Sequence, residues 1–159
     1  MSKKILITGS NGQIGNSLNL FFEDKDFDLK YTSLNVTKNH ILPLDLTLSD
    51  NVESIFDNYK PDFIINTAGY TNVDLSEIHH NIASKVNVNI VKNLLKYMPK
   101  TTKIIHISSD YIFDGFNSPY SEQDLPNPLN YYGQTKLEAE NLIRSSRKKY
   151  IIIRRNSWQ

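Results

Sequence analysis

Residues 4–15 read KILITGSNGQIG, and this stretch decides the fold. Lys4–Thr8 predicts a short buried strand, and Ile14–Phe22 places apolar residues at the spacing of one helix face. Three glycines in the pattern G-x-x-G-x-x-G join the two elements: Gly9, Gly12 and Gly15. Glycine lets the backbone approach a ligand closely, and the start of a helix attracts phosphate groups. We therefore predict a dinucleotide site here, with a plain tight turn as the alternative.

The rest of the chain repeats this alternation of short apolar runs and helical patterns. Further strands are predicted at Asp28–Leu34, Ile41–Leu44, Asp62–Thr67, Lys103–Ser108 and Tyr150–Arg154. Further helices are predicted at Ser49–Tyr59, Ile82–Met98 and Tyr132–Ser145, the last after a long loop that ends near Asn130. Apolar strands that alternate with helices form a parallel sheet covered on both faces. The predicted fold class is α/β, a doubly wound parallel sheet (Rossmann fold), with residues 1–159 as one NAD(P)-binding domain.

Composition excludes several classes of protein. The 159 residues are 39% hydrophobic and 22% charged with a net charge of +1, which is ordinary for one globular domain and favours no nucleic-acid partner. The chain has no cysteine, so disulfides, thiolate catalysis and zinc–thiolate sites are excluded. No apolar run approaches the roughly 18 residues of a membrane span. The start, Met-Ser-Lys-Lys, does not resemble a signal peptide, so we expect a cytoplasmic protein without a membrane partner.

Two smaller groups of residues receive structural interpretations. The four histidines form no cluster, so no metal site is predicted, and His106 is expected to be a packed core residue inside its strand. The last sixteen residues hold all four arginines and no acid, which favours a solvated helix end and strand end over a binding patch. These arginines are Arg144, Arg147, Arg154 and Arg155.

A Tyr-x-x-x-Lys pair begins the last predicted helix. Its spacing of four puts Tyr132 and Lys136 on one helix face, one turn apart. A free tyrosine has a pKa near 10, and a nearby ammonium group lowers that pKa toward the range useful for acid–base catalysis. Ser109 ends the fifth strand, at the edge where doubly wound sheets bind ligands. These three residues are the predicted catalytic set, with a solvated helix face as the alternative for the Tyr–Lys pair.

The glycine spacing and the Tyr-x-x-x-Lys pair together resemble the short-chain dehydrogenase/reductase superfamily. The resemblance implies that Asp45 holds the adenine ring, although it also suits a turn before a helix. Asn66-Thr67-Ala68-Gly69 resembles the N-x-A-G turn that lines the cofactor. Asn87 is similar to an Asn that ties a long helix to the sheet, with an ordinary structural role as the alternative.

Three longer stretches resemble the dTDP-4-dehydrorhamnose reductase family: residues 65–74, 107–115 and 127–138. The resemblance implies that reduced nicotinamide delivers hydride to C4 of a 4-keto-6-deoxy sugar nucleotide, while Tyr132 donates the proton. It also implies that Lys136 tunes Tyr132 and anchors the ribose, and that Ser109 orients the carbonyl, where these reductases often have Thr. The implied substrate contacts are Ser109, Asp110 and Trp158. The implied cofactor contacts are Gly9, Asn11, Gly12, Gln13, Ile14, Gly15, Asp45, Leu46, Ala68, Gly69, Tyr70, Asn87, Tyr132 and Lys136.

Several alternatives remain open. Related sugar-nucleotide dehydratases carry Thr-Asp-Glu where this chain has Ser109-Asp110-Tyr111, and Tyr cannot replace the Glu base, so a dehydratase is disfavoured. Epimerases usually end in Val-Tyr-Gly where this chain has Ile-Phe-Asp-Gly. The β subunit of methionine adenosyltransferase, a non-catalytic NADP-binding regulator, also resembles these reductases. Residues 30–35 hold no acid, no Arg and one Lys, so both NADP and NAD remain candidate cofactors.

The resemblance covers only the N-terminal part of such reductases. The family normally continues past the sixth strand into a smaller domain that closes over the sugar nucleotide, so a C-terminal substrate domain is expected to be absent here. We therefore expect a fragment or a natural short form, with a competent cofactor site, a half-built substrate site and severely reduced turnover. An apolar surface left uncovered would favour association, with a homodimer as the simplest form.

Overall fold

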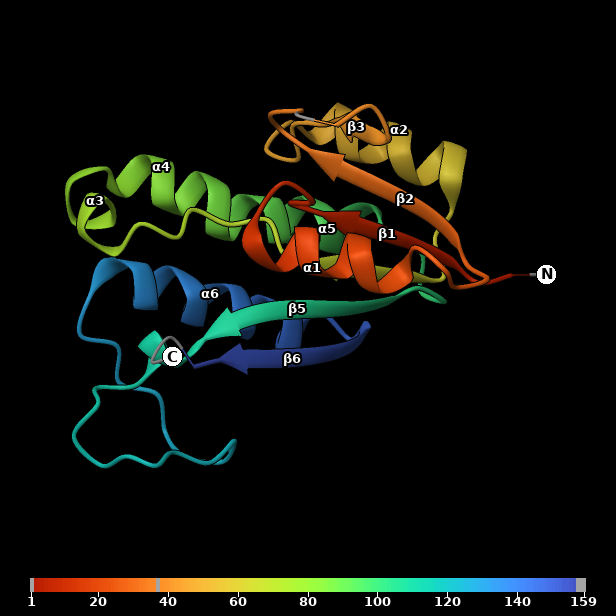
Figure 1. Ribbon diagram of the computed structural model, residues 1–159. Coiled ribbons are helices and arrows are strands. Elements are labelled where there is room, and N and C mark those ends of the chain that lie inside the picture. Colours follow the sequence, from red (N-terminus) through yellow and green to blue (C-terminus); the bar gives the residue numbers. More distant parts are fainter. Residues whose placement is uncertain (1, 37, 157–159) are drawn as a thin grey trace.

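The computed structural model describes residues 2–36 and 38–156. Six strands form one sheet: β1 (Lys4–Thr8), β2 (Asp28–Ser33), β3 (Ile41–Pro43), β4 (Phe63–Asn66), β5 (Lys103–Ser109) and β6 (Lys149–Arg155). All paired strands run parallel, in the order β3-β2-β1-β4-β5-β6 (Figure 1). The order reverses between β1 and β4, as in a doubly wound sheet. The predicted α/β fold class is confirmed.

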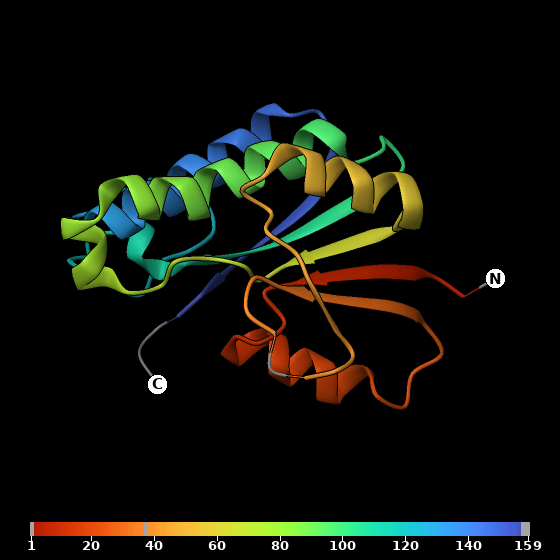
Figure 2. The same ribbon diagram turned by 90° about the horizontal axis from the view of Figure 1, so that it is seen from above.

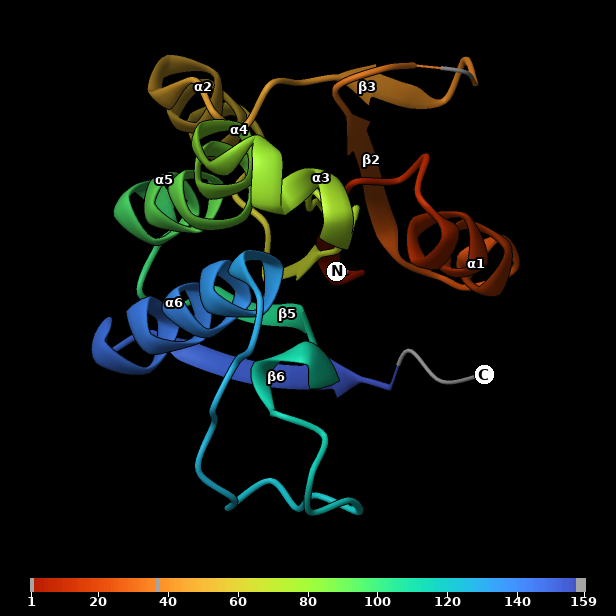
Figure 3. The same ribbon diagram turned by 90° about the vertical axis from the view of Figure 1, so that its left-hand side faces the viewer.

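Helices cover the two faces of the sheet unequally. Helix α1 (Gln13–Phe22) lies alone on one face, whereas α2 (Ser49–Tyr59), α5 (Ile90–Tyr97) and α6 (Tyr131–Ser145) lie on the other (Figures 2 and 3). The larger apolar core lies under these three helices, and a smaller core lies under α1. Burial of these apolar faces against the sheet is the main favourable contribution to folding.

The long helical pattern predicted over Ile82–Met98 is more irregular in the structure. It begins earlier, as α4 (His80–Ser84), passes through a π-helical turn η1 (Lys85–Asn89), and continues as α5. A π turn contains more residues than an α turn, and such turns occur often at functional sites. The spacing of apolar residues does not reveal the change, because the flanking α-helical turns keep their own pattern.

Two short elements that the sequence did not predict lie beside the ends of β4 and β5. Helix α3 (Val73–Ile78) begins after Asn72, whose side chain accepts a hydrogen bond from the main-chain N–H of Leu75 at 2.9 Å. The 3₁₀ turn η2 (Asp110–Ile112) follows β5 directly. Elements this short carry too little periodicity for a prediction from hydrophobic spacing.

Two glycines of the first loop allow close backbone packing. Gly9 has φ of +68°, and a Cβ there would lie 2.6 Å from the main-chain nitrogen of Ala68 after β4. A Cβ at Gly15 would lie 2.4 Å from the carbonyl oxygen of Gly9. The loop therefore lies directly against the end of β4, and α1 lies directly against the loop.

The sheet face on the α1 side is less covered near β6. Ile151 and Ile153 pair with Ile105 and Ile107 of β5 and remain 42% and 47% exposed. Ile105 of β5 packs against the smaller core under α1. The side chains of Ile151 and Ile153 therefore extend the edge of that core toward β6, where they are partly exposed. The sequence predicted an uncovered apolar surface. The homodimer that such a surface would favour stays a prediction. No helix within the described ranges is long and apolar enough to cross a membrane.

Gly133 supplies a test of how α6 is placed. A Cβ at this position would lie 2.1 Å from the carbonyl oxygen of Tyr111 in η2, and main-chain atoms cannot move aside cheaply. We expect Gly133→Ala to lower the free energy of unfolding by about 1–3 kcal/mol, measured by urea denaturation. The neighbouring, exposed Gln134→Ala is the control and should change stability little. Equal stabilities of the two variants would contradict the close packing.

Candidate active site

The predicted site residues collect at one edge of the sheet, where the parallel strands end. β1, β4 and β5 are neighbours, and their register places Thr8, Asn66 and His106 side by side. The glycine loop follows β1, the 67–70 turn follows β4, and Ser109 ends β5. Strand pairing therefore brings segments about 100 residues apart in the chain into one site.

The start of α1 has the features of a phosphate site. Gly12 caps the helix without a side-chain hydrogen bond, and the first turn holds no acid. Helix starts carry N–H groups that have no partner inside the helix. Asn16 and Asn19 brace the loop by donating to the carbonyl oxygens of Asn11 and Ser10 at 3.0 and 3.3 Å. Because Gly12 and Gln13 are also exposed, the loop fits a pyrophosphate group.

The structure points to a cation near this loop that the sequence analysis did not single out. Lys30, the one Lys in the stretch first considered, lies over the Tyr59 ring at 4.6 Å. Lys38, in contrast, donates to the side-chain oxygen of Asn16 in α1 at 3.0 Å. The sequence gives little indication of this contact. Lys38 lies beyond the end of β2, and the path of the β2–β3 connection decides how far Lys38 is from the glycine loop.

Asp45 and Leu46 lie between β3 and α2. The Asp45 carboxylate accepts hydrogen bonds from the main-chain N–H and the hydroxyl of Thr47, at 2.9 and 2.7 Å. This is the turn role that the sequence left as the alternative, and contact with an adenine ring stays a prediction. The Leu46 side chain is buried in the larger core, so only its main chain can face a ligand.

Asn87 uses its side chain to join three segments. Its carboxamide oxygen accepts from the Tyr70 N–H at 2.7 Å, and its nitrogen donates to the Tyr70 carbonyl and the Thr135 hydroxyl, at 3.1 and 2.9 Å. It thereby connects the turn after β4 with η1 and α6. A Cβ on Gly69 would lie 3.2 Å from the same carboxamide oxygen. In this structure Asn87 positions the site through these bonds.

Ser109 and Tyr132 come together, as the sequence predicted for a catalytic pair. Ser109 is the last residue of β5, at the site edge, and both it and the preceding Ser108 are buried. Burial raises the pKa of Tyr132 above its usual value, and a side-chain hydrogen bond with Ser109 opposes that rise. The lowering of this pKa that the sequence analysis expected from Lys136 is therefore not seen, because burial of the phenol dominates. Tyr132 is therefore protonated at neutral pH, as a proton donor must be. Their catalytic roles stay predictions.

Lys136 is buried one turn after Tyr132. Its ammonium group donates to the carbonyl oxygen of Ile107 at 2.7 Å. Burial lowers the pKa of Lys136 to about 8, and the carboxylate of Glu140 opposes this shift. Nearby His106 is 1% exposed, and burial together with the Lys136 charge holds its pKa well below the usual range. His106 is the packed core residue that the sequence predicted.

One expectation about the arginines is wrong. Arg154 is not a solvated strand end: its side chain is only 14% exposed and forms an ion pair with fully buried Glu140 at 2.9 Å. Arg144 contacts the same carboxylate at 3.3 Å from a more exposed position. Sequence reasoning missed Glu140 as well, since a carboxylate on a polar-looking helix gives no sign that it is buried.

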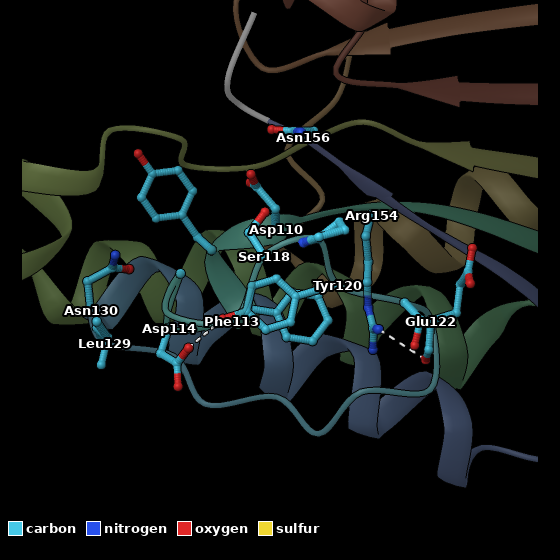
Figure 4. Close-up of a pocket in the computed structure, with 14 residues that line it drawn as sticks. Asp110, Phe113, Asp114, Ser118, Tyr120, Glu122, Leu129, Asn130, Arg154 and Asn156 are labelled. Atoms are coloured by element: carbon cyan, nitrogen blue, oxygen red, sulfur yellow. Dashed lines mark hydrogen bonds between the residues drawn. The ribbon is translucent and has the colours of Figure 1, made fainter.

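A pocket of 640 Å³ begins at Asp110, the residue that directly follows Ser109 in the chain (Figure 4). Asp110 and Tyr111 of η2 line it on one side, and the loop after η2 forms most of the remaining wall. Asp114 holds that loop together by accepting from the Tyr120 hydroxyl at 2.5 Å and from the Asn127 amide at 3.0 Å. The predicted substrate residue Asp110 thus faces a cavity, while Trp158 lies outside the described residues.

Tyr131, the neighbour of the predicted acid, is engaged elsewhere. Its ring stacks on His80 with centroids 3.8 Å apart, and its main-chain N–H donates to Glu77 of α3. Among the described residues, no three His, Asp or Glu side chains are grouped so that they could hold a metal ion.

Comparison with known families decides the wider assignment. The profile described as the RmlD substrate binding domain matches residues 3–158. The chain belongs to this family. The resemblance to dTDP-4-dehydrorhamnose reductases that the motifs indicated is therefore confirmed.

Two curated relatives bear on the function. The chain is 40% identical to the dTDP-4-dehydrorhamnose reductase of Aggregatibacter actinomycetemcomitans over 157 residues, which are 98% of this chain and 51% of that protein. It is also 35% identical to the methionine adenosyltransferase 2 subunit beta of Danio rerio over 141 residues, 89% of this chain and 43% of that protein. The chain thus spans about half the length of the curated relatives it matches.

A solved structure supports the same family. The dTDP-4-dehydrorhamnose reductase of Bacillus anthracis, crystallised in complex with NADP, is 28% identical with a TM-score of 0.86. The match covers 98% of this chain and 54% of that one.

The buried Lys136 predicts an unusual dependence of stability on pH. A lysine whose pKa is about 8 when folded and about 10.4 when unfolded destabilises the fold while it is charged, and the penalty disappears as pH rises through this window. We expect Lys136→Met to be more stable than the parent at pH 7, by about 1–3 kcal/mol. The difference should shrink between pH 8 and pH 10.4, measured by urea denaturation across pH. A constant difference across this range would contradict the lowered pKa.

Proposed function

We propose that residues 1–159 act as the NAD(P)-binding domain of a sugar-nucleotide reductase. The reaction is reduction of the 4-keto group of a dTDP-4-dehydro-6-deoxy sugar, as in the formation of dTDP-L-rhamnose-type sugars. The reduced nicotinamide, when bound, supplies hydride to C4. The observation that carries the proposal is that a protonated, buried Tyr132, its partner Ser109 and Lys136 lie at the same sheet edge as an uncapped, glycine-rich helix start.

The chain's own residues would divide the work as follows. Tyr132 transfers its proton to the carbonyl oxygen as hydride arrives at C4, so that the ketone becomes an alcohol and Tyr132 becomes a phenolate. Ser109 orients that carbonyl, and Lys136 stabilises the phenolate through its positive charge. Asp110 contacts the sugar from the pocket wall. Water must then return a proton to Tyr132 before the next cycle.

The cofactor would lie across the sheet edge. The start of α1 would hold the pyrophosphate, and the main chain of the 68–70 turn, which Asn87 keeps in place, would line the nicotinamide half. Lys38 near the loop favours the 2′-phosphate of NADPH over the free 2′-hydroxyl of NADH. The NADP complex of the Bacillus anthracis relative supports this preference.

A second candidate function is a non-catalytic NADP-binding regulator. The 35% identity to the methionine adenosyltransferase 2 subunit beta of Danio rerio favours it. Such a protein would bind NADPH tightly without turnover and would act through a partner enzyme. A sugar-nucleotide epimerase has weaker support, because the UDP-glucose 4-epimerase of Brucella ovis is only 21% identical and shows the fold alone.

Cofactor binding can be tested without disturbing the fold. A Cβ at Gly12 would approach one main-chain oxygen, that of Gly9, at 3.2 Å, so Gly12→Ala should fold. Its methyl group would project where the pyrophosphate must approach, and we expect NADPH affinity to fall about tenfold or more in a fluorescence titration. Ser17→Ala, on the exposed side of α1, is the matched control and should bind as the parent does. Equal binding by Gly12→Ala would overturn the placement of the phosphates.

Turnover separates the reductase from the regulator. For residues 1–159 tested alone, which match 51% of the Aggregatibacter relative, we expect NADPH oxidation that depends on a dTDP-4-dehydro-6-deoxy sugar. The rate should be about 100-fold or more below that of the full-length relative, because binding energy from the remote nucleotide is incompletely used. Tyr132→Phe should abolish this slow reaction while NADPH still binds. Tight NADPH binding with no turnover at any enzyme concentration would favour the regulator.

A further inference from the structure

We propose that Glu140 is a positioning residue that keeps Lys136 positively charged inside the protein. The two residues are four apart on α6, so their side chains leave the same face of the helix one turn apart. Glu140 is completely buried and Lys136 is 5% exposed. The inference rests on the proposed function only for its catalytic consequence, since the pairing itself is a property of the folded chain.

Glu140 is held in its charged form by two arginines. Arg154 donates through Nε and Nη2 to the two carboxylate oxygens, at 3.1 and 2.9 Å. This bidentate arrangement consists of two hydrogen bonds between charged groups, which are stronger than bonds between neutral ones. Arg144 adds a third contact at 3.3 Å. These arginines outweigh burial and hold the pKa of Glu140 below its usual value. A buried anion is therefore present beside Lys136 at every physiological pH.

The other groups around Lys136 do not supply this negative charge. The side-chain oxygen of Asn66 accepts a hydrogen bond from Thr8, so the Asn66 nitrogen is the atom that faces Nδ1 of His106 in β5. Because this nitrogen donates, Nδ1 carries no proton, and His106 is neutral. Arg154 from β6 is a cation. The carbonyl oxygen of Ile107 contributes only a dipole.

Further charged groups on the elements around α6 lie at its ends or bond elsewhere. Asp110 of η2 lies at the site edge and accepts from Ser109. Glu77 of α3 accepts from the main chain of Tyr131, and Lys92 of α5 pairs with Glu138. Protonated Tyr132 carries no charge. Glu140 thus remains the buried carboxylate that faces Lys136 among the described residues.

The charge matters because Lys136 is close to losing its proton. With Glu140 present, the pKa of Lys136 is about 8, so the side chain is mostly charged at pH 7. A neighbouring opposite charge typically contributes about one to three pKa units. Without Glu140 the pKa of Lys136 would fall further below its usual value, and a neutral amine could not stabilise the Tyr132 phenolate.

The pKa of Lys136 can be measured directly, in the protein without ligand. In ¹³C-lysine-labelled protein, the Cε signal of Lys136, assigned by its loss in Lys136→Met, reports protonation across pH. We expect Glu140→Gln to lower this pKa by about one unit or more. Arg144→Gln is the matched control: it removes a cation from the same carboxylate while Arg154 keeps Glu140 charged, and it should not lower the pKa of Lys136. An unchanged or raised pKa in folded Glu140→Gln would overturn the proposal.

A second variant protects the test against misfolding. Glu140→Gln leaves Arg154 without its ion-pair partner, whereas Glu140→Leu combined with Arg154→Met replaces the buried pair by apolar groups, which proteins often tolerate. The pKa of Lys136 should fall in this double variant as well, and an unchanged value there would equally overturn the proposal.

The catalytic consequence has a separate readout. If the chain reduces a sugar nucleotide, activity should decline above about pH 8 in the parent, and in Glu140→Gln that decline should move down by the same amount as the NMR pKa. Absence of turnover in the parent would count against the proposed function alone, because the NMR titration does not depend on it. A lowered NMR pKa without a shift of the activity profile would overturn the catalytic role of the Glu140 charge.

Discussion

The close contact between α6 and η2 is the constraint on which the candidate site depends. Gly133 lies against the carbonyl group of Tyr111 at a distance that no side chain would permit. This contact seats the start of α6 beside the end of β5. It follows that Tyr132 reaches Ser109, Lys136 reaches the carbonyl of Ile107, and Glu140 reaches Arg154 of β6. The close approach at Gly133 thus stands at the start of a helix whose next turns carry Lys136 and Glu140.

Buried charged groups lie under α6, where most helix interfaces are apolar. Burial of Lys136, Glu140 and most of Arg154 costs desolvation energy that ion pairing returns only in part. Proteins keep such arrangements where function needs them. Arg154 also donates to the carbonyl oxygen of Glu122 and lies over the Phe113 ring, so the same ion pair braces the wall of the pocket. Arg154 therefore contributes both to the charge distribution of the candidate site and to the shape of the pocket.

Local patterns were enough for the fold class and for most of the candidate site. A few neighbouring residues were enough to predict the strand, glycine loop and helix of residues 4–22. The same holds for the Tyr132–Lys136 pair, which is recognised from its spacing of four. The turn after α4 and the burial of Glu140 could not be read in this way. A π-helical turn leaves the surrounding apolar spacing nearly intact, and a carboxylate on a helix is exposed unless a distant cation meets it.

The sequence by itself determined the six strands and the longer helices, where the glycine loop lies, and which family the chain resembles, because these depend on neighbours in the chain. Only the tertiary structure decided which side chains meet. Lys38 approaches α1, Asn87 bonds to Tyr70 and Thr135, and Glu140 pairs with Arg154, through strand order and helix packing that join distant segments. The physical reason is that burial, and with it the charge state of a side chain such as Lys136, arises from all the elements packed around it.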